Sequence, residues 1–113
     1  MIAHSKYRAR KTTIDGITFD SKAEARRYAD LKLMERAGAI SNLELQPAFV
    51  LLESFRDATG ALHRAITYRA DFRYTEGGKV IVEDVKGMET REFKMKRKML
   101  LSRYPETNLR ITA

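Results

Sequence analysis

The sequence predicts an α/β domain, in the broad sense that includes α+β folds, with a mixed β-sheet core flanked by helices. The first observation is a capping box, Ser21-Lys22-Ala23-Glu24, which predicts a helix to about Ala37, where Gly38 offers a left-handed stop. The second is the run Val80–Val85, which reads as apolar on both faces, as in a central strand. The third is a helical segment over Thr90–Tyr104, closed by Pro105.

The remaining elements are predicted by alternation and by turn residues. Asp15-Gly16 is typical of a two-residue turn and predicts a small hairpin over 12–19. Between the helices we expect strands over 43–46, 49–52, 64–74 and 80–85, and a short last strand over 109–111. In the third of these segments, alternation places four residues on one side, Tyr68, Ala70, Phe72 and Tyr74.

Length and composition indicate one globular domain. A chain of 113 residues is too short for two independent cores, so we expect a basic flexible arm over 1–11 and a single domain over 12–113. The absence of cysteine excludes disulfides, thiolate metal sites and cysteine nucleophiles. No apolar run approaches the ~18 residues of a membrane span and no signal peptide opens the chain, so we expect a cytoplasmic protein with no membrane partner.

The net charge of +7 is concentrated in two zones. The first eleven residues contain four basic residues and no acid, among them Lys6, Arg8 and Arg10. The segment 86–104 contains seven basic and two acidic residues, and its Arg91, Lys94 and Lys98 recur at helical spacing as a cationic stripe. Two basic zones on a slightly acidic body favour a polyanionic partner such as DNA, although a charged stripe can also be an ordinary solvated face.

The candidate active site consists of three ionisable residues at the ends of two predicted neighbouring strands, Asp71, Asp84 and Lys86. In Val80–Lys86 the period of two places Asp84 and Lys86 on one face. In an antiparallel hairpin where the numbers of paired residues add up to an odd value, Asp71 lies on that face as well. A register that pairs Asp71 with Asp84 requires a four-residue loop over 76–79. If the pairing slipped by one residue, Glu83 would replace Asp84 beside Asp71.

Two close carboxylates and an ammonium suit metal-dependent phosphodiester hydrolysis. Carboxylates held together repel one another until a divalent cation such as Mg²⁺ or Mn²⁺ neutralises them. The cation polarises the phosphodiester, and a nearby lysine can orient the attacking water or neutralise developing charge. The alternative is that both carboxylates merely end strands, with Lys86 as their ion-pair partner.

Four motifs resemble the PD-(D/E)XK nuclease superfamily, and more narrowly a family of small phage and prophage proteins placed near these nucleases. They are Phe19-Asp20-Ser21-Lys22-Ala23-Glu24-Ala25, Leu45-Gln46-Pro47, Tyr68-Arg69-Ala70-Asp71-Phe72 and Val82-Glu83-Asp84-Val85-Lys86-Gly87. The resemblance implies a restriction-endonuclease-like fold, a DNA substrate and a phage-infected or lysogenic bacterial host. One departure is Ala70, which stands where many members have proline.

The resemblance also implies roles for individual residues. Asp71 and Asp84 would bind the metal together with the carbonyl of Val85, Lys86 would serve the attacking water, and Glu24 would be the helix carboxylate. Glu24 has an alternative role, because the capping box alone explains an acid at that position. Gln46 could contact the water shell of the metal or only cap a sheet edge.

The sequence therefore predicts a metal-dependent DNA endonuclease that could be structure-specific. It leaves open the form of the substrate, which could be a junction, a flap, a duplex, a single strand or RNA. A non-catalytic nucleic-acid-binding module on the same fold is the main alternative, and a basic protein that coats nucleic acid is another. The two carboxylates favour the enzyme, because without a metal they would repel phosphates. A homodimer is expected if both strands of a duplex are cut symmetrically, since that requires two sites.

Overall fold

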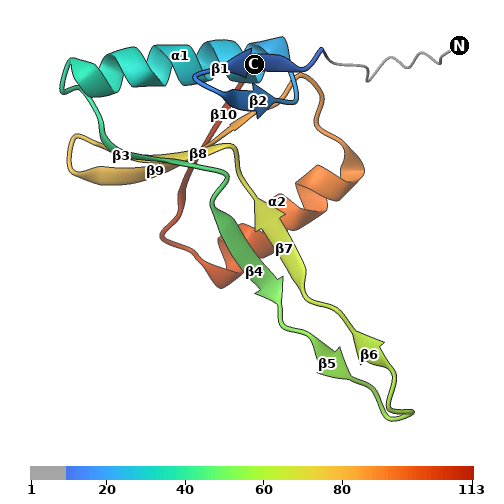
Figure 1. Cartoon of the computed structure of the whole chain (residues 1–113). Coiled ribbons are helices and arrows are strands. Elements are labelled where there is room, and N and C mark those ends of the chain that lie inside the picture. The colour runs from blue at the N-terminus through green and yellow to red at the C-terminus, as the bar shows by residue number, and fades with distance from the viewer. Residues whose placement is uncertain (1–9) are drawn as a thin grey trace, which may run out of the picture.

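A computed structural model describes residues 10–113 of the protein, in which two helices flank a mixed β-sheet (Figure 1). Of the predicted basic arm, Lys6 and Arg8 lie outside the described residues, whereas Arg10 is described and exposed. The elements in chain order are β1 (Thr12–Ile14), β2 (Ile17–Phe19), α1 (Lys22–Arg36), β3 (Ser41–Leu45), β4 (Ala48–Leu52), β5 (Phe55–Arg56), β6 (Leu62–His63), β7 (Ile66–Arg69), β8 (Phe72–Glu76), β9 (Lys79–Val85), α2 (Arg91–Arg103) and β10 (Asn108–Thr112).

The N-terminal hairpin and the first helix form as the sequence predicts. β1 pairs antiparallel with β2, and the turn residues Asp15 and Gly16 have φ of 54° and 75°. Ser21 caps α1, because its hydroxyl accepts a hydrogen bond from the Glu24 N–H at 3.0 Å. Gly38, with φ of 81°, follows the helix at the expected stop.

The central sheet is mixed, with the strand order β10-β9-β8-β3. β9 lies inside the sheet, antiparallel to β8 and parallel to β10. α2 forms the connection from β9 to β10. In the β8–β9 hairpin Glu76 pairs with Lys79, so Gly77 and Gly78 alone form the turn, both with positive φ. The expected four-residue loop is therefore wrong, because two consecutive glycines allow a tighter turn in the same register.

The two helices cover opposite faces of the sheet and divide the core (Figure 1). On the α1 face, Tyr28 and Leu31 pack with Phe72, Tyr74 and Ile81. On the α2 face, Phe93 and Leu100 pack with Tyr68, Ala70 and Val82.

The sequence predicts that four residues lie on one side of one strand, Tyr68, Ala70, Phe72 and Tyr74, and this prediction is wrong. All four side chains are buried, but Tyr68 and Ala70 belong to the α2 core and Phe72 and Tyr74 to the α1 core. The predicted strand over 64–74 is interrupted at Ala70 and Asp71, where the chain passes from β7 into β8. The interruption changes the face on which later residues lie.

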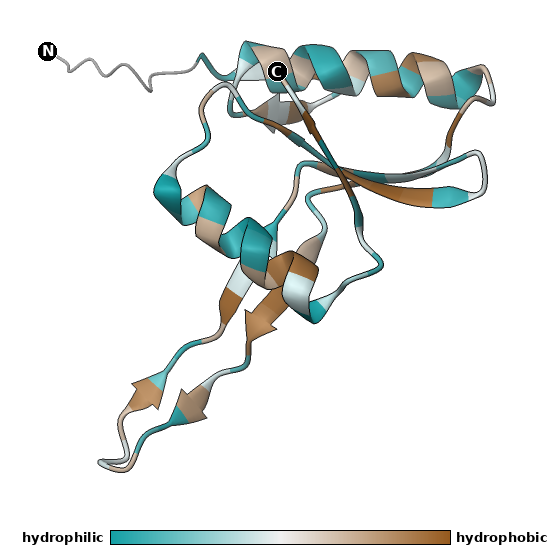
Figure 2. Ribbon diagram, turned by 180° about the vertical axis from the view of Figure 1, so that it is seen from behind, coloured by the Kyte–Doolittle hydropathy of each residue, from teal (hydrophilic) through white to brown (hydrophobic). Residues whose placement is uncertain are grey.

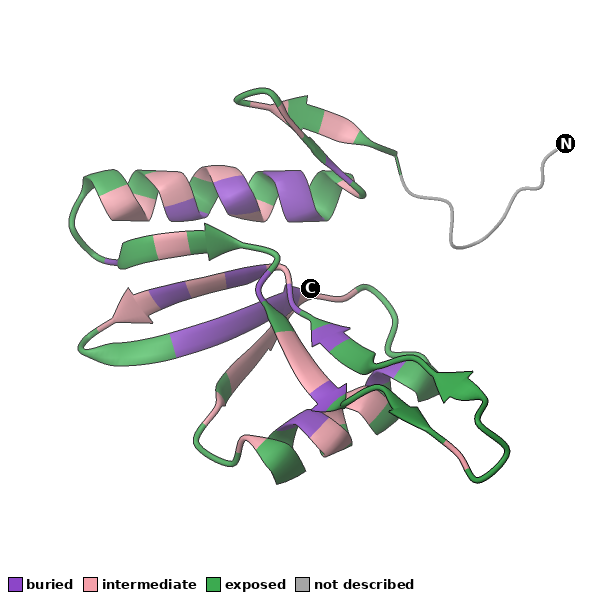
Figure 3. Cartoon of the chain, turned by 60° about the horizontal axis from the view of Figure 1, so that its bottom comes forward, coloured by how far each residue is buried: buried purple, intermediate pink, exposed green. Residues whose placement is uncertain are grey.

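β7 belongs to a separate two-stranded ribbon that projects from the sheet. β4 pairs with β7, and beyond them β5 pairs with β6 (Figure 1). The end of this ribbon is exposed (Figure 3), although its strands carry apolar residues (Figure 2), among them Leu52, Phe55 and Leu62.

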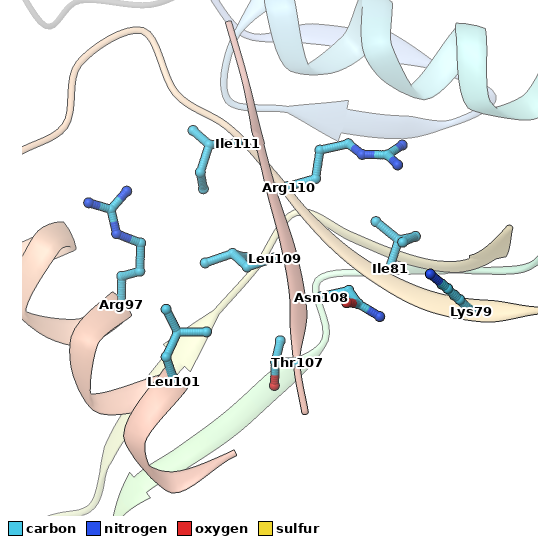
Figure 4. Close-up of a pocket in the computed structure, with 9 residues that line it drawn as sticks. All are labelled: Lys79, Ile81, Arg97, Leu101, Thr107, Asn108, Leu109, Arg110 and Ile111. Atoms are coloured by element: carbon cyan, nitrogen blue, oxygen red, sulfur yellow. The ribbon is translucent and has the colours of Figure 1, made fainter. Parts of the chain in front are cut away.

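The edge strand β10 lines a cavity of about 670 Å³ between the sheet and α2. Leu109 and Ile111 point toward α2, whereas Arg110 extends from the opposite side of the strand (Figure 4). None of the carboxylates that the sequence singles out lines this cavity. Among residues 10–113, no helix is long and apolar enough to cross a membrane.

Candidate functional site

Asp71 and Asp84 lie opposite one another where β8 begins and β9 ends. The register pairs Phe72 with Glu83, and one further step along the ladder brings Asp71 beside Asp84. The Asp71 N–H donates to the Glu83 carbonyl at 3.1 Å and to Asp84 Oδ1 at 3.1 Å. In return, the Val85 N–H donates to Asp71 Oδ2 at 2.8 Å. The structure therefore brings together the two carboxylates that the sequence pairs.

Asp84 is the more enclosed of the two acids, with 1% of its surface exposed. Its Oδ1 accepts from the Asp71 amide, and its Oδ2 accepts from the Tyr68 hydroxyl. A buried carboxyl group requires hydrogen bonds or charges that replace its lost hydration. Both oxygens of Asp84 have such a donor.

Asp71 is less enclosed, and its environment raises its pKa. Burial raises the pKa of Asp71 to about 6, and the Asp84 carboxylate adds to the rise. The Val85 N–H and the charge of Lys86 act in the opposite direction. A cation bound beside Asp71 would stabilise its ionised form, which burial and the neighbouring carboxylate disfavour.

Glu24 faces this pair rather than the end of its own helix. The hydroxyl half of the capping box forms, but no hydrogen bond of the described residues runs from the Ser21 N–H to the Glu24 carboxylate. The side chain is 9% exposed and lines a pocket of about 240 Å³ with Gln46 and Asp71. The second hydrogen bond of a capping box, from the Ser21 N–H to the Glu24 carboxylate, is therefore missing from the described part of the chain, and Glu24 is buried at the pocket instead.

Burial raises the pKa of the Glu24 carboxyl to about 7. The negative charges of Asp71, Asp20 and Asp84 raise this pKa further, and the Lys86 ammonium lowers it. These influences place Glu24 in the same electrostatic environment as the two aspartates.

Lys86 lies on the α2 side of the sheet, next to Asp84. Its Nζ is 4.9 Å from the centre of the Phe93 ring, a cation–π contact with the first turn of α2. Lys86 and Asp84 line a second pocket, of about 360 Å³, together with Tyr68, Arg69 and Lys96. The ammonium thus lies beside Asp84, and Lys86 forms no ion pair within residues 10–113.

The donor set suits a hard divalent cation. Within residues 10–113, no three His, Cys, Asp or Glu side chains already surround a single ion position. Mg²⁺ does not require such a cage, because it binds through one or two carboxylates and retains several waters. Asp71 and Asp84 supply two carboxylates, and Glu24 stands across the adjoining pocket. Val85 contacts Asp71 through its N–H.

Glu83 is excluded from the site by its partners on the opposite face. Its carboxylate receives Arg27 Nε at 2.6 Å and Arg27 Nη2 at 3.0 Å, together with the hydroxyls of Tyr74 and Thr112. The one-residue slip that would exchange Glu83 and Asp84 does not occur.

The cationic stripe of α2 is exposed. The side chains of Arg91, Lys94 and Lys98 face solvent, and none of them belongs to an ion pair of the described residues. Lys96 and Arg97, in contrast, pair with Glu92 and Glu89 at 3.1 Å each. The stripe is therefore available to a polyanion on the side of the sheet where Lys86 lies.

Two residues, Tyr68 and Gln46, make contacts at the site that the sequence does not predict. Tyr68, expected only in the core, contacts Asp84, and no sequence signal reveals where a buried hydroxyl points. Gln46 lines the Glu24 pocket with φ of 52°, and its N–H donates to the Asp71 carbonyl at 2.9 Å. A left-handed residue directly before proline is unusual, so Gln46 is a strained position at the site.

Comparisons with known proteins provide a family but no activity. Neither the curated proteins nor the solved structures contain a match. A family model described as "Protein of unknown function (DUF1064)" matches residues 4–113. The chain therefore belongs to the DUF1064 family.

Proposed function

We propose that this protein is a metal-dependent DNA endonuclease that hydrolyses phosphodiester bonds. The observation that carries the proposal is the apposition of Asp71 and Asp84 at one end of β8 and β9, through reciprocal backbone contacts. Lys86 and Glu24 stand beside this pair from two different elements. A carboxylate pair with an ammonium is the arrangement expected for phosphodiester hydrolysis with Mg²⁺ or Mn²⁺.

Each residue has a distinct role in this proposal. Asp71 and Asp84 would hold the cation, which when bound polarises the phosphodiester and stabilises the charge of its transition state. Lys86 presents an ammonium that orients the attacking water or neutralises charge developing at phosphorus. Glu24, with a pKa of about 7, is poised near neutral pH to accept or release a proton in the pocket it shares with Asp71.

DNA is the substrate that the charge distribution favours. Arg91, Lys94 and Lys98 form an exposed stripe on α2, which follows Lys86 in the chain. Such side chains contact phosphates and so add to affinity without reading base sequence. A role in processing phage or prophage DNA, and the pairing of two copies for double-strand cleavage, extend this proposal and rest on the resemblance of the motifs.

A second candidate function is nucleic-acid binding without catalysis. Both oxygens of Asp84 already accept hydrogen bonds, and the described residues form no ready cage of three ligands. These two observations would fit a fold that retains the acids only as structural groups. The two candidates differ in whether any substrate is cut.

The decisive experiment incubates the full chain with branched and linear DNAs, in single- and double-stranded form, with EDTA, Mg²⁺ or Mn²⁺. We expect cleavage of at least one substrate only when the cation is present. Asp84→Asn should abolish that cleavage while DNA binding is retained or improved, because one negative charge near the phosphates is lost. Glu106→Gln serves as a control, since Glu106 is exposed beyond the end of α2, whereas Lys86 lies before its start. Binding without cleavage under every condition would favour the second candidate.

A further inference from the structure

Tyr68 is joined to the candidate metal site by a single hydrogen bond. Its hydroxyl donates to Asp84 Oδ2, while the Asp71 N–H donates to Asp84 Oδ1 at 3.1 Å. The two oxygens of Asp84 are thus held from two sides, one by the backbone of Asp71 directly before β8 and the other by a side chain of β7. Tyr68 is therefore the one side chain among the described residues that donates to this carboxylate.

The position of the hydroxyl is fixed by the packing of the ring. Tyr68 is 3% exposed and pairs with Phe49 across the β4–β7 ladder. Its ring lies 6.2 Å from that of Phe93 in α2. A buried aromatic ring with a polar end has few alternative rotamers, so its hydroxyl acts as a rigid donor.

We propose that Tyr68 is a positioning residue, whose hydroxyl orients the Asp84 carboxylate for binding a divalent cation together with Asp71. This inference rests on the proposed function, because it assumes that the two aspartates bind a cation. A ligand that is already oriented loses less conformational freedom when the ion arrives. The cation then uses the remaining lone pairs of the carboxylate, and the tyrosine maintains its orientation.

The opposite face of the sheet provides a matched comparison. Tyr74 is also buried, and its hydroxyl donates to Glu83, the residue before Asp84. Glu83, however, is already bound by Arg27 and Thr112 and lies on the α1 face. Both tyrosines therefore donate to a buried carboxylate of β9, but only Tyr68 donates to one that belongs to the candidate metal site.

The test compares Tyr68→Phe with Tyr74→Phe in the full chain, and each substitution removes a single oxygen atom. Isothermal titration with Mn²⁺ in the absence of DNA measures cation affinity directly, and thermal unfolding in EDTA measures stability. Outer partners of metal ligands typically contribute 10- to 100-fold in affinity. We expect Tyr68→Phe to weaken Mn²⁺ binding by about 10-fold or more. Tyr74→Phe should reduce the melting temperature but leave Mn²⁺ affinity within about twofold of wild type, because Glu83 is outside the site.

The outcomes separate this inference from the proposed function. Wild-type protein that binds Mn²⁺, with Tyr68→Phe binding it as tightly or more tightly, would overturn the role of Tyr68 and leave the nuclease proposal intact. Equal weakening by both substitutions would also overturn it, because the loss would then reflect general destabilisation. Wild-type protein that binds no divalent cation would overturn both proposals together. Weaker Mn²⁺ binding by Tyr68→Phe alone supports the positioning role. In a cleavage assay, this variant should then regain activity at higher Mn²⁺ concentration.

Discussion

Glu83 and Asp84 are consecutive in β9 and both buried, yet their carboxylates serve opposite faces of the sheet. Glu83 is held by Arg27 of α1, and Asp84 is held by Tyr68 of β7 and the amide of Asp71. The alternation of a strand produces this division, and the β8–β9 register determines which acid faces Asp71. Glu83 therefore connects β9 to α1, and Asp84 faces the candidate site.

Removing the charge of Glu83 should destabilise the fold. Glu83 is 0% exposed and makes a two-pronged ion pair with Arg27. Glu83→Gln leaves the Arg27 guanidinium without its counter-charge in a largely buried setting, which costs about 3 kcal/mol. Urea unfolding measures the change, with Glu44→Gln as the control. That substitution breaks an exposed pair with Arg73 and should cost less than about 1 kcal/mol. Equal effects of the two substitutions would contradict a structural role for Glu83.

Stability without metal should fall as the pH rises through the neutral range. The pKa values of Glu24 and Asp71 are raised to about 7 and about 6 in the folded state, from 4.5 and 3.8. Between the unfolded and folded pKa values the native state binds more protons, so folding stability decreases with pH. Glu83 has a lowered pKa and therefore opposes this trend, but only in the acid range below about 4.5.

Thermal unfolding in EDTA between pH 5.5 and 8 tests this expectation. We expect the melting temperature of the wild type to decrease by about 10 °C over that interval, because the two raised pKa values together correspond to about 2 to 3 kcal/mol of lost stability. Glu24→Gln should flatten the decrease, because it removes one of the two carboxyl groups with a raised pKa. Mg²⁺ should restore stability at pH 8, since it neutralises the ionised acids. A melting temperature that is unchanged or rises in EDTA would show that Glu24 and Asp71 are not destabilised as anions.

Patterns within single elements make much of this fold predictable from the sequence. The Asp15-Gly16 turn, the Ser21 cap and the glycine stop predict the hairpin and α1. Strand alternation predicts that Asp71 meets Asp84 only for an odd-sum register, and the structure has that register. These signals are local, because turn chemistry and strand alternation depend on neighbouring residues.

The other features depend on contacts between distant segments. The alternation of polar and apolar residues does not show where a chain leaves one pair of strands for another. The break at Ala70 and Asp71 and the projecting ribbon were therefore not predicted. The Glu24 carboxylate leaves its cap because the fold places a pocket beside it. The Tyr68 hydroxyl reaches a residue sixteen positions away, which no spacing rule indicates.

Relieving the backbone strain at Gln46 should stabilise the protein. Gln46 has φ of 52° directly before Pro47, a conformation that costs a residue with a side chain about 1 kcal/mol. Gln46→Gly removes this cost, partly offset by the flexibility of glycine in the unfolded chain. Asn42→Gly is the control, because Asn42 has a similar φ of 56° but asparagine tolerates it well. Urea unfolding should show a larger gain at Gln46 than at Asn42, and a loss at Gln46 would show that its side chain contributes more than the strain costs.

Reversing the charge of the α2 stripe should weaken DNA binding and reduce its salt dependence. Arg91 and Lys94 are exposed and outside the ion pairs of the described residues. The double substitution Arg91→Glu, Lys94→Glu removes two phosphate contacts, so the slope of log K against log salt should fall by about 2. The control reverses Arg26 and Arg36, two exposed arginines of α1 on the other face of the sheet, and changes the net charge equally. Equal losses in both double variants would indicate a non-specific effect of net charge.

Lys86 should separate chemistry from binding. Lys86→Ala removes one ammonium beside Asp84 and leaves both aspartates in place. If this ammonium orients the attacking water or neutralises charge at phosphorus, the cleavage rate under single turnover should fall by about 100-fold or more. DNA affinity should change little, because one phosphate contact among many is a small part of the electrostatic attraction. Lys79→Ala is the matched control, since Lys79 is exposed at the opposite end of the same strand and should leave the rate unchanged. A rate that falls in proportion to DNA affinity would make Lys86 a binding residue, and an unaffected rate would remove it from the proposed mechanism.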